Sequence, residues 1–209
     1  MPVPPGEGWQ PRALREDNDV VSSSGPTDGG WVGRARGRAS VLRTDRLLLT
    51  TWTSHDLPDL EALHGDPVAM KYMVSGVLNR DQTRAHLLSW QREHTAQGWS
   101  KWRVQHQDGR FVGRAGFSRA HETSCREVGC LVAPQFWGCG LATEIVNALT
   151  RWHQQDAEAA VDPDLLAYVL AANAVSRHVL EKTGYKCIGL DSNDSRQLIY
   201  RNRLEREHM

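Results

Sequence analysis

The sequence lacks the features that would place a protein in a membrane or on a nucleic acid. No apolar run in its 209 residues approaches the roughly 20 residues needed to cross a bilayer. The first 30 residues contain no apolar segment typical of a signal peptide. The 25 basic and 25 acidic residues cancel, so the large positive field of a nucleic-acid-binding protein is missing. We therefore expect a cytoplasmic protein whose main function involves neither a membrane nor nucleic acid.

Cysteine is also scarce, and its positions do not form a recognisable site. The four residues Cys125, Cys130, Cys139 and Cys187 include no CxxC pair, and their spacing matches neither a disulfide framework nor a zinc site. The nine histidines include no HExxH or similar constellation. The sequence predicts reduced thiols in or near the core and no bound metal.

The length allows one domain with an extension, because a domain usually has about 100 to 200 residues. Residues 1–40 are rich in Pro, Gly, Ser and Asp and show no sustained helical or strand period. We interpret residues 1–40 as a disordered tail and residues 41–207 as the folded domain. The basic segment 34–38 could contact RNA, although three arginines beside several upstream acidic residues more often form a solvated linker.

Strand and helix patterns alternate from residue 41 onward. Apolar residues three and four positions apart predict helices from Ser54 to Gly65, from Asp81 to Gly98, over 141–158 and from Asn173 to Gly184. Alternating or continuous apolar runs predict strands at 46–52, 100–106, 111–117, 126–132, 165–170, 185–190 and 197–204. The chain is thus expected to have an α/β fold with six to seven strands and about four helices.

The clearest candidate site is the turn that joins the strand at 126–132 to the following helix. Gly138-Cys139-Gly140 opens that helix, where exposed backbone N–H groups and the positive helix end favour a phosphate group. The glycines let the backbone approach the phosphate closely. The segment is neither a GxxxxGK[ST] nor a GxGxxG motif, and as a bare GxG it could also be a structural turn.

Three longer segments resemble the GNAT superfamily of acetyltransferases. The segment Val132-Ala133-Pro134-Gln135-Phe136-Trp137-Gly138-Cys139-Gly140-Leu141-Ala142-Thr143-Glu144 resembles their CoA-binding segment with its Q/R-x-x-G-x-G/A motif. Asn173-Ala174-Val175-Ser176 with Leu180-Glu181-Lys182-Thr183-Gly184-Tyr185 resembles their N-x-x-S and L-E-K-x-G-F/Y block. Leu42-Arg43-Thr44-Asp45-Arg46-Leu47-Leu48-Leu49 is similar to the opening of the branch that contains the RimJ and RimL ribosomal-protein N-terminal acetyltransferases. The resemblance spans about residues 41–207.

This resemblance implies a GNAT fold with a mixed, mostly antiparallel sheet that is splayed between its fourth and fifth predicted strands. It also implies that acetyl-CoA is the co-substrate. The backbone of Leu131 and Val132 would pair with the pantetheine arm, and Asn173 would contact that arm while also capping its helix. Gln135 and the helix start would bind the pyrophosphate, through Trp137, Gly138, Cys139, Gly140, Leu141, Ala142 and Thr143. No Arg or Lys lies in this loop, so the amides would bind the anion.

Acetyl transfer to an amine also needs a neutral nucleophile and a proton for the departing thiolate. Many GNAT enzymes use a tyrosine seven residues after the asparagine as the acid, and here that position is Leu180. The Rim-type resemblance gives the role to Ser176, which could instead merely pack in its helix. Glu127 matches a position that often faces the acceptor amine and is the candidate base, with a solvated strand-end carboxylate as the alternative and His121 as a rival. Cys139 receives no chemical role.

The resemblance implies an N-acetyltransferase whose acceptor is a protein or peptide N-terminus or a small amine. Because Leu180 replaces the usual acid, a catalytically idle acyl-CoA-binding regulatory module of the same fold stays open as a second function. The expected partners are acetyl-CoA and the amine, and the protein is expected to be a monomer or a homodimer.

Overall fold

The computed structural model of the chain describes residues 37–120, 123–156 and 162–203. Nearly all of the predicted tail, residues 1–40, lies outside the described residues, and so does His121.

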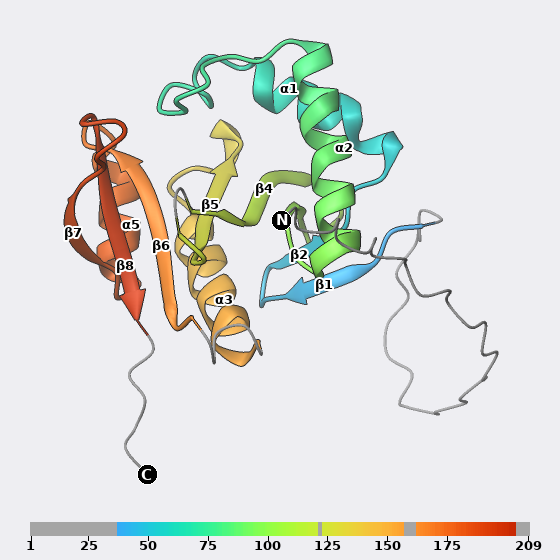
Figure 1. Cartoon of the computed structure of the whole chain (residues 1–209). Helices are drawn as coiled ribbons and strands as arrows, with labels where there is room; N and C mark the ends of the chain where they lie inside the picture. The colour runs from blue at the N-terminus through green and yellow to red at the C-terminus, as the bar shows by residue number, and fades with distance from the viewer. Residues whose placement is uncertain (1–36, 121–122, 157–161, 204–209) are drawn as a thin grey trace, which may run out of the picture. The chain divides into compact units, whose positions relative to one another are not determined.

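All strands belong to one sheet in the order β1-β2-β3-β4-β5-β6-β8-β7 (Figure 1). Only the pair β5 and β6 is parallel, which confirms the predicted mixed and mostly antiparallel sheet. The strands are β1 (Ser40–Arg43), β2 (Leu47–Thr50), β3 (Lys101–His106), β4 (Phe111–Arg119), β5 (Arg126–Val132), β6 (Asp164–Leu170), β7 (Lys186–Leu190) and β8 (Gln197–Arg203).

The sheet has eight strands instead of the six to seven predicted. The additional strand is β1, which is only four residues long and falls at the boundary between the predicted tail and the domain. It pairs with β2 through an irregular register, Ser40 with Thr50 and then Leu42 with Leu49. A period of two cannot be recognised over so few residues, so the sequence places the first strand of the domain only at 46–52.

The described residues contain four α-helices, as predicted, namely α1 (Leu57–Gly65), α2 (Arg80–Gln97), α3 (Leu141–Gln155) and α5 (Ala174–Lys182). Short 3-10 turns, η1 (Ser54–Asp56) and η2 (Pro134–Phe136), precede α1 and the loop before α3. The predicted starts of the first two helices were slightly wrong. Asn79, not Asp81, caps α2 in a capping box with Gln82. Thr53, not Ser54, takes the cap position of η1 together with Asp56.

Two hydrophobic cores form on opposite faces of the sheet, because successive side chains of a strand point to opposite sides. In β5, Val128 and Val132 contribute to the core under α3 and α5, whereas Leu131 contributes to the core under α1 and α2. In the first core the rings of Trp102, Phe117 and Trp152 lie with centroids 5.2–5.7 Å apart. Full burial of one large apolar side chain stabilises the fold by about 1.5–3 kcal/mol.

The parallel pair β5 and β6 is splayed, as expected. The two strands pair only through Arg126 with Leu165 and Glu127 with Leu166, near their amino ends. Beyond these residues β5 stays paired with β4 on its other side up to Val132. Figure 1 shows β5 and β6 separating toward their carboxyl ends. Beyond Glu127, this edge of β5 therefore has no strand partner among the residues that the structure describes.

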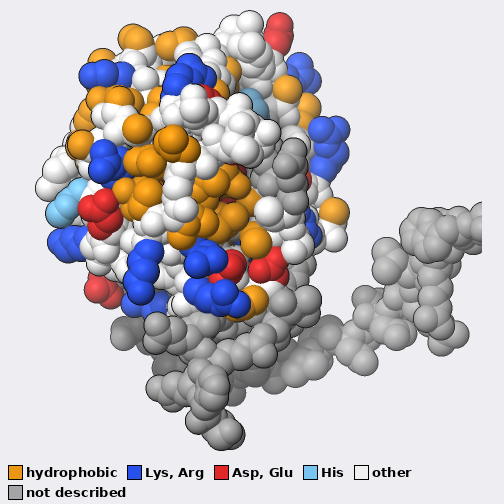
Figure 2. Space-filling model, turned by 60° about the vertical axis from the view of Figure 1, so that its left-hand side comes forward, with side chains coloured by type: hydrophobic (Ala, Val, Ile, Leu, Met, Phe, Trp, Pro, Cys, Tyr) orange, Lys and Arg blue, Asp and Glu red, His pale blue; other side chains and the backbone are white. Residues whose placement is uncertain are grey.

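The C-terminal edge of the sheet bears exposed apolar side chains. Ile188 and Leu190 of β7 are 48% and 60% exposed. Figure 2, in which the side of β7 and β8 is turned forward, shows an area of hydrophobic side chains bordered by basic and acidic ones.

None of the helices in the described ranges is both long and apolar enough to cross a membrane.

Candidate active site

The turn after β5 offers a row of free backbone donors. Gly138 and Gly140 have φ angles of 76° and 75°, in the left-handed region that favours glycine, and Gly140 is the N-cap of α3. From Gly138 to Thr143, no backbone N–H donates to an acceptor within the described ranges. The residues from Trp137 to Gly140 are exposed. Open N–H groups at a helix N-terminus suit a phosphate group, so the geometry fits the predicted pyrophosphate loop.

A cation from outside this loop lies against it. Arg46 Nη1 donates to the Cys139 carbonyl at 2.8 Å, and Arg46 Nε donates to Glu144 Oε2 at 2.6 Å. Glu144 also accepts from the Arg46 backbone and from the Thr44 hydroxyl. Burial opposes ionisation of Glu144, but the hydrogen bonds from Thr44 and Arg46 outweigh it and lower the pKa of this carboxyl. The sequence shows no basic residue within the loop, and Arg46 was not predicted to lie beside it. The only sequence feature that pointed to Arg46 is its position in the Thr44-x-Arg46 part of the segment that resembles the RimJ and RimL branch.

The backbone contact predicted for Leu131 is not supported. Ala133 N donates to Val112 O at 2.8 Å, which fixes the hydrogen-bond register of β4 and β5. In that register the N–H and C=O of Leu131 point toward β4, and those of Cys130 and Val132 point toward the splayed edge. The contact of Val132 with the pantetheine arm therefore stays a prediction that the register allows, and Cys130 has the same orientation as Val132.

Trp137 occupies part of this edge. Its indole Nε1 donates to the Val132 carbonyl at 2.7 Å, while the ring itself is exposed. Because a carbonyl oxygen has two lone pairs, one acceptor direction at Val132 stays available. Gln135 is exposed on η2, beside the loop.

The start of α5 lies at the same edge of the sheet as the start of α3, because the parallel strands β5 and β6 lead into these two helices. The Asn173 side chain accepts from Ser176 N at 3.1 Å, so it acts as a helix cap. The Ser176 hydroxyl is half-buried and has no partner among residues 37–120, 123–156 and 162–203. Leu180 is buried in the core, so the position of the usual tyrosine provides no proton.

Glu127 lies at the closed end of the splayed pair. It is half-buried, pairs with Leu166 of β6, and accepts a hydrogen bond from Ser118 Oγ at 3.2 Å. Ser176 follows the carboxyl end of β6, at the open end of the pair. The structure shows no contact between Glu127 and Ser176, so one group cannot simply replace the other.

A buried lysine beside Glu127 was missed by sequence reasoning. Lys101 of β3 pairs with Gly116 of β4, which pairs with Gly129 of β5. Gly129 leaves room for the Lys101 side chain, because Nζ lies 3.1 Å from where a Cβ of Gly129 would be. Nζ also donates to the Gly116 carbonyl at 3.2 Å. Burial lowers the pKa of Lys101 to about 8, against the attraction of Glu127. The strand sequence carries no signal for this burial, because the burial depends on the helices that cover this face.

Replacement of Lys101 by Met is expected to remove a pH dependence of stability. The pKa of Lys101 is about 8 in the folded protein and 10.5 unperturbed, so between these values the unfolded chain binds more protons. The free energy of unfolding of the wild type should therefore rise from pH 7 to pH 10 by about 2 kcal/mol relative to the Lys101→Met variant.

Urea denaturation of both proteins at several pH values measures this difference. The exposed Lys71 provides the matched control, because Lys71→Met should leave the slope unchanged. Parallel pH profiles of the wild type and Lys101→Met would contradict a depressed pKa at Lys101.

The cysteines match the prediction in part. All four thiols are free; Cys125 and Cys130 are half-buried, but Cys139 and Cys187 are exposed. The Cys139 carbonyl accepts from Arg46, which places Cys139 in the loop, away from Glu127 at the other end of β5.

Comparisons with known proteins agree with this geometry. The acetyltransferase (GNAT) domain family matches residues 46–186. YkkB of Bacillus subtilis (strain 168) is 28% identical over 146 residues, which cover 66% of this chain and 84% of YkkB.

Solved acetyltransferase structures share the fold. The acetyltransferase of Agrobacterium tumefaciens str. C58 superimposes with a TM-score of 0.68 at 24% identity and covers 82% of this chain and 100% of its own. RimL, the ribosomal L7/L12 alpha-N-protein acetyltransferase in complex with coenzyme A, gives a TM-score of 0.65 at 15% identity, over 77% of this chain and 96% of RimL. At these identities the likeness concerns the fold.

Proposed function

Because the chain belongs to the acetyltransferase (GNAT) family, we propose that it transfers the acetyl group of acetyl-CoA to a primary amine by direct attack in a ternary complex. The observation that supports this most is the splayed pair of β5 and β6, with the open N–H groups of Gly138 to Thr143 at its carboxyl end. An extended, anionic co-substrate fits such a site, since its phosphates meet the amides and its arm meets the unpaired strand edge.

Acetyl-CoA would be held mainly by backbone groups. The amides from Gly138 to Thr143, with Arg46 beside them, would bind the pyrophosphate. The outward backbone groups of Cys130 and Val132 would pair with the pantetheine arm as a further strand does. Asn173 and Gln135 would add side-chain contacts from the start of α5 and from η2.

Glu127 would receive the proton of the acceptor amine. Its carboxylate is oriented by the Ser118 hydroxyl and lies at the closed end of the splayed pair, near Lys101. At pH 7, deprotonation of a lysine-like amine with a pKa of ~10.4 costs about 4.6 kcal/mol, whereas an α-amine with a pKa of ~7.8 costs only about 1 kcal/mol. An α-amine therefore places a smaller demand on the base, and RimL, which shares the fold, is an alpha-N-protein acetyltransferase. We favour a peptide N-terminus or a small amine of similar basicity.

Ser176 would assist the departing thiolate through its unpartnered hydroxyl. Ser176→Ala is expected to lower kcat by about 100-fold or less and to leave acetyl-CoA affinity nearly unchanged, because a bond to the developing thiolate forms mainly in the transition state. Steady-state kinetics together with calorimetry of acetyl-CoA binding separate the two quantities. A loss of affinity with unchanged kcat would assign Ser176 to co-substrate binding instead.

A second function is a catalytically idle acyl-CoA-binding module, which the buried Leu180 favours because it replaces the usual acid. An acceptor screen with acetyl-CoA and a panel of amines, followed by mass spectrometry of the products, distinguishes the two. An acetylated product supports the transferase. Acetyl-CoA binding without consumption in the presence of any amine supports the idle module.

A further inference from the structure

Arg114 differs from the other buried arginines of the described residues, which are Arg103 and Arg126. Arg103 has a carboxylate partner in Asp59 at 2.7 Å, and Arg126 has one in Asp156 at 2.9 Å. Arg114 is only 8% exposed, yet no carboxylate lies within ion-pair distance of it in the described ranges. Glu127 attracts Arg114 only from beyond ion-pair distance. Buried charges are normally paired, so this guanidinium is prepared for an anion that the described residues do not place against it.

The guanidinium is held in place through its Nε and its flat face. Arg114 Nε donates to His64 Nε2 at 3.1 Å, and its Cζ lies 5.4 Å from the centroid of the Trp90 ring. Its terminal nitrogens have no partner within the described ranges and are not among the sealed polar atoms of the core. The two-pronged edge of the guanidinium, which suits a carboxylate or a phosphate, is therefore free.

His64 is neutral and fixes the orientation of Arg114. Burial, and then the nearby Arg114 charge, lower the pKa of His64 to about 3. Because Nε2 accepts from Arg114, the proton resides on Nδ1, which lies 3.3 Å from Thr83 Oγ1. His64 and Thr83 are both fully buried, on α1 and α2. They act as positioning residues for Arg114.

Arg114 shares one face of the sheet with the proposed base. Ser118 is in register with Glu127, Gly116 with Gly129, and Arg114 with Leu131. The Glu127 carboxylate, the Lys101 ammonium and the Arg114 guanidinium therefore occupy successive register positions on this face, although they come from three neighbouring strands. Successive positions on one face are two residues, or roughly 6.8 Å, apart along the strand direction. The splayed edge of β5 runs beside this row.

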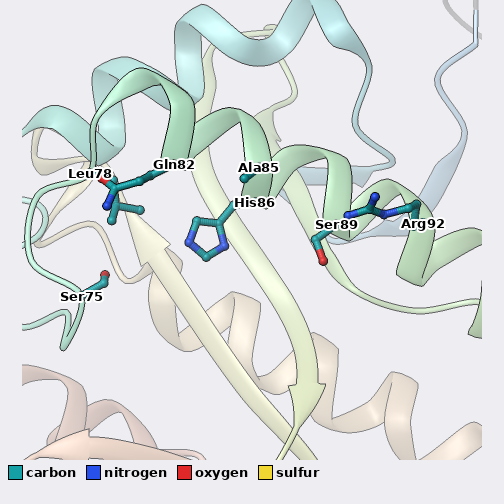
Figure 3. Close-up of a pocket in the computed structure, with 7 residues that line it drawn as sticks. All are labelled: Ser75, Leu78, Gln82, Ala85, His86, Ser89 and Arg92. Atoms are coloured by element: carbon teal, nitrogen blue, oxygen red, sulfur yellow. The ribbon is translucent and has the colours of Figure 1, made fainter.

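An open cavity of about 570 Å³ lies between α2 and the segment before it. His86 lines this cavity, and Figure 3 shows its ring extending from α2 into the space that Ser75 borders on the other side. The His86 ring stacks on Trp90 at 5.5 Å and lies 6.1 Å from the His64 ring, and both of these rings contact Arg114. Through His86, the cavity gives a polar molecule room on the side of α2 that packs over Arg114.

We propose that the acceptor is an amine that also bears an anionic group, a carboxylate or a phosphate, which Arg114 binds while Glu127 receives the amine. Arg114 and Glu127 are separated by four residue positions along the strand direction, on the order of 13 Å, and both side chains extend over the same face. Short acidic peptides, amino acids and aminoalkyl phosphates meet this requirement. The inference rests on the proposed acetyl transfer to an amine and specifies its substrate class.

The test compares acceptors in matched pairs that differ in one anionic group. Suitable pairs are phosphoethanolamine with ethanolamine, and the peptide amides Ser-Asp-Ala and Ser-Asn-Ala. For each pair, the ratio of kcat/KM for the anionic to the neutral acceptor is measured in the wild type and in Arg114→Gln. Division of one ratio by the other removes the intrinsic reactivity of each amine.

We expect the ratio to fall about 10- to 100-fold in Arg114→Gln, the size of a lost charge-assisted hydrogen-bond pair. Arg114→Lys keeps the positive charge but loses the two-pronged guanidinium, so its ratio should lie between those of the wild type and Arg114→Gln. Arg92→Gln is the matched control, because Arg92 is an exposed arginine that lines the cavity together with His86, and it should change the ratio less than about threefold. Unchanged acetyl-CoA affinity shows that each variant is folded.

An equal ratio in the wild type and Arg114→Gln would overturn the inference while acetyl transfer stands. If no amine is acetylated, ligand-observed NMR of phosphoethanolamine and ethanolamine decides. Arg114-dependent binding of phosphoethanolamine alone would support the anion site and overturn the proposed transfer. Absence of such binding would overturn the anion site as well.

Discussion

Replacement of Gly140 by Asp is expected to weaken acetyl-CoA binding by about 100- to 1000-fold. The new carboxylate would face the phosphates at the N-terminus of α3, and two like charges about 4 Å apart repel each other by roughly 4 kcal/mol near a protein surface. A Cβ at Gly140 would also lie 3.8 Å from Arg46 Nη2, so the aspartate would compete for the cation beside the loop. Calorimetry of acetyl-CoA binding measures the loss.

Two further variants separate charge from backbone strain. Gly140→Ala introduces a Cβ at φ 75° and costs about 1–2 kcal/mol of stability, but adds no charge, so it should retain most of the affinity. Gly98→Asp adds the same carboxylate at φ 81° at the end of α2. This position is beside the start of β3, near the amino end of β5 and not near the loop, so the variant should bind acetyl-CoA normally. Wild-type affinity in Gly140→Asp would show that the anion binds elsewhere.

The parts of the fold that follow from local pattern were predictable from the sequence. The long helix α3 repeats its apolar residues every three to four positions, and the Asp108-Gly109 turn between β3 and β4 is a strong hairpin signal. The N-cap of α5 at Asn173 is of the same kind. Each depends on residues within one turn or one helix, so no tertiary information is needed.

The charged centre of the site was not predictable, because it depends on register and on what covers the sheet. Lys101 and Arg114 alternate with apolar neighbours, which alone would place them in solvent. The face is buried only because α1 and α2 cover it, and this packing cannot be inferred from the strand sequences. Likewise, the outward direction of Cys130 rather than Leu131 follows from pairing with β4, not from the sequence of β5.

Arg46 illustrates the same limit at longer range. It is 93 residues away from Cys139 along the chain, yet it donates to that carbonyl. The loop can be recognised from its own glycines. The side chain that stabilises it comes from the connection between β1 and β2, and its position is known only once the arrangement of the whole sheet is known.

Glu127→Gln is expected to lower kcat/KM by about 10²- to 10⁴-fold for a lysine-like acceptor and by less for an α-amine. Glutamine keeps the size of the side chain and can still accept from Ser118 Oγ, so the change removes basicity with little effect on packing. The unequal effect follows from the greater cost of deprotonating a lysine-like amine at neutral pH. Rates with both acceptors from pH 6 to pH 9 test the prediction.

A readout independent of turnover comes from Lys101, whose pKa the Glu127 carboxylate raises against the effect of burial. In Glu127→Gln the pKa of Lys101 should fall below its value of about 8, so the rise of unfolding free energy with pH should begin at a lower pH. Glu181→Gln is the matched control, because Glu181 also accepts a hydroxyl hydrogen bond, from Tyr200 at 2.8 Å, but lies on α5, which packs on the other face of the sheet. It should keep wild-type rates. Wild-type rates in Glu127→Gln on both acceptors, with a shifted Lys101 titration, would exclude Glu127 as the base while confirming its place beside Lys101.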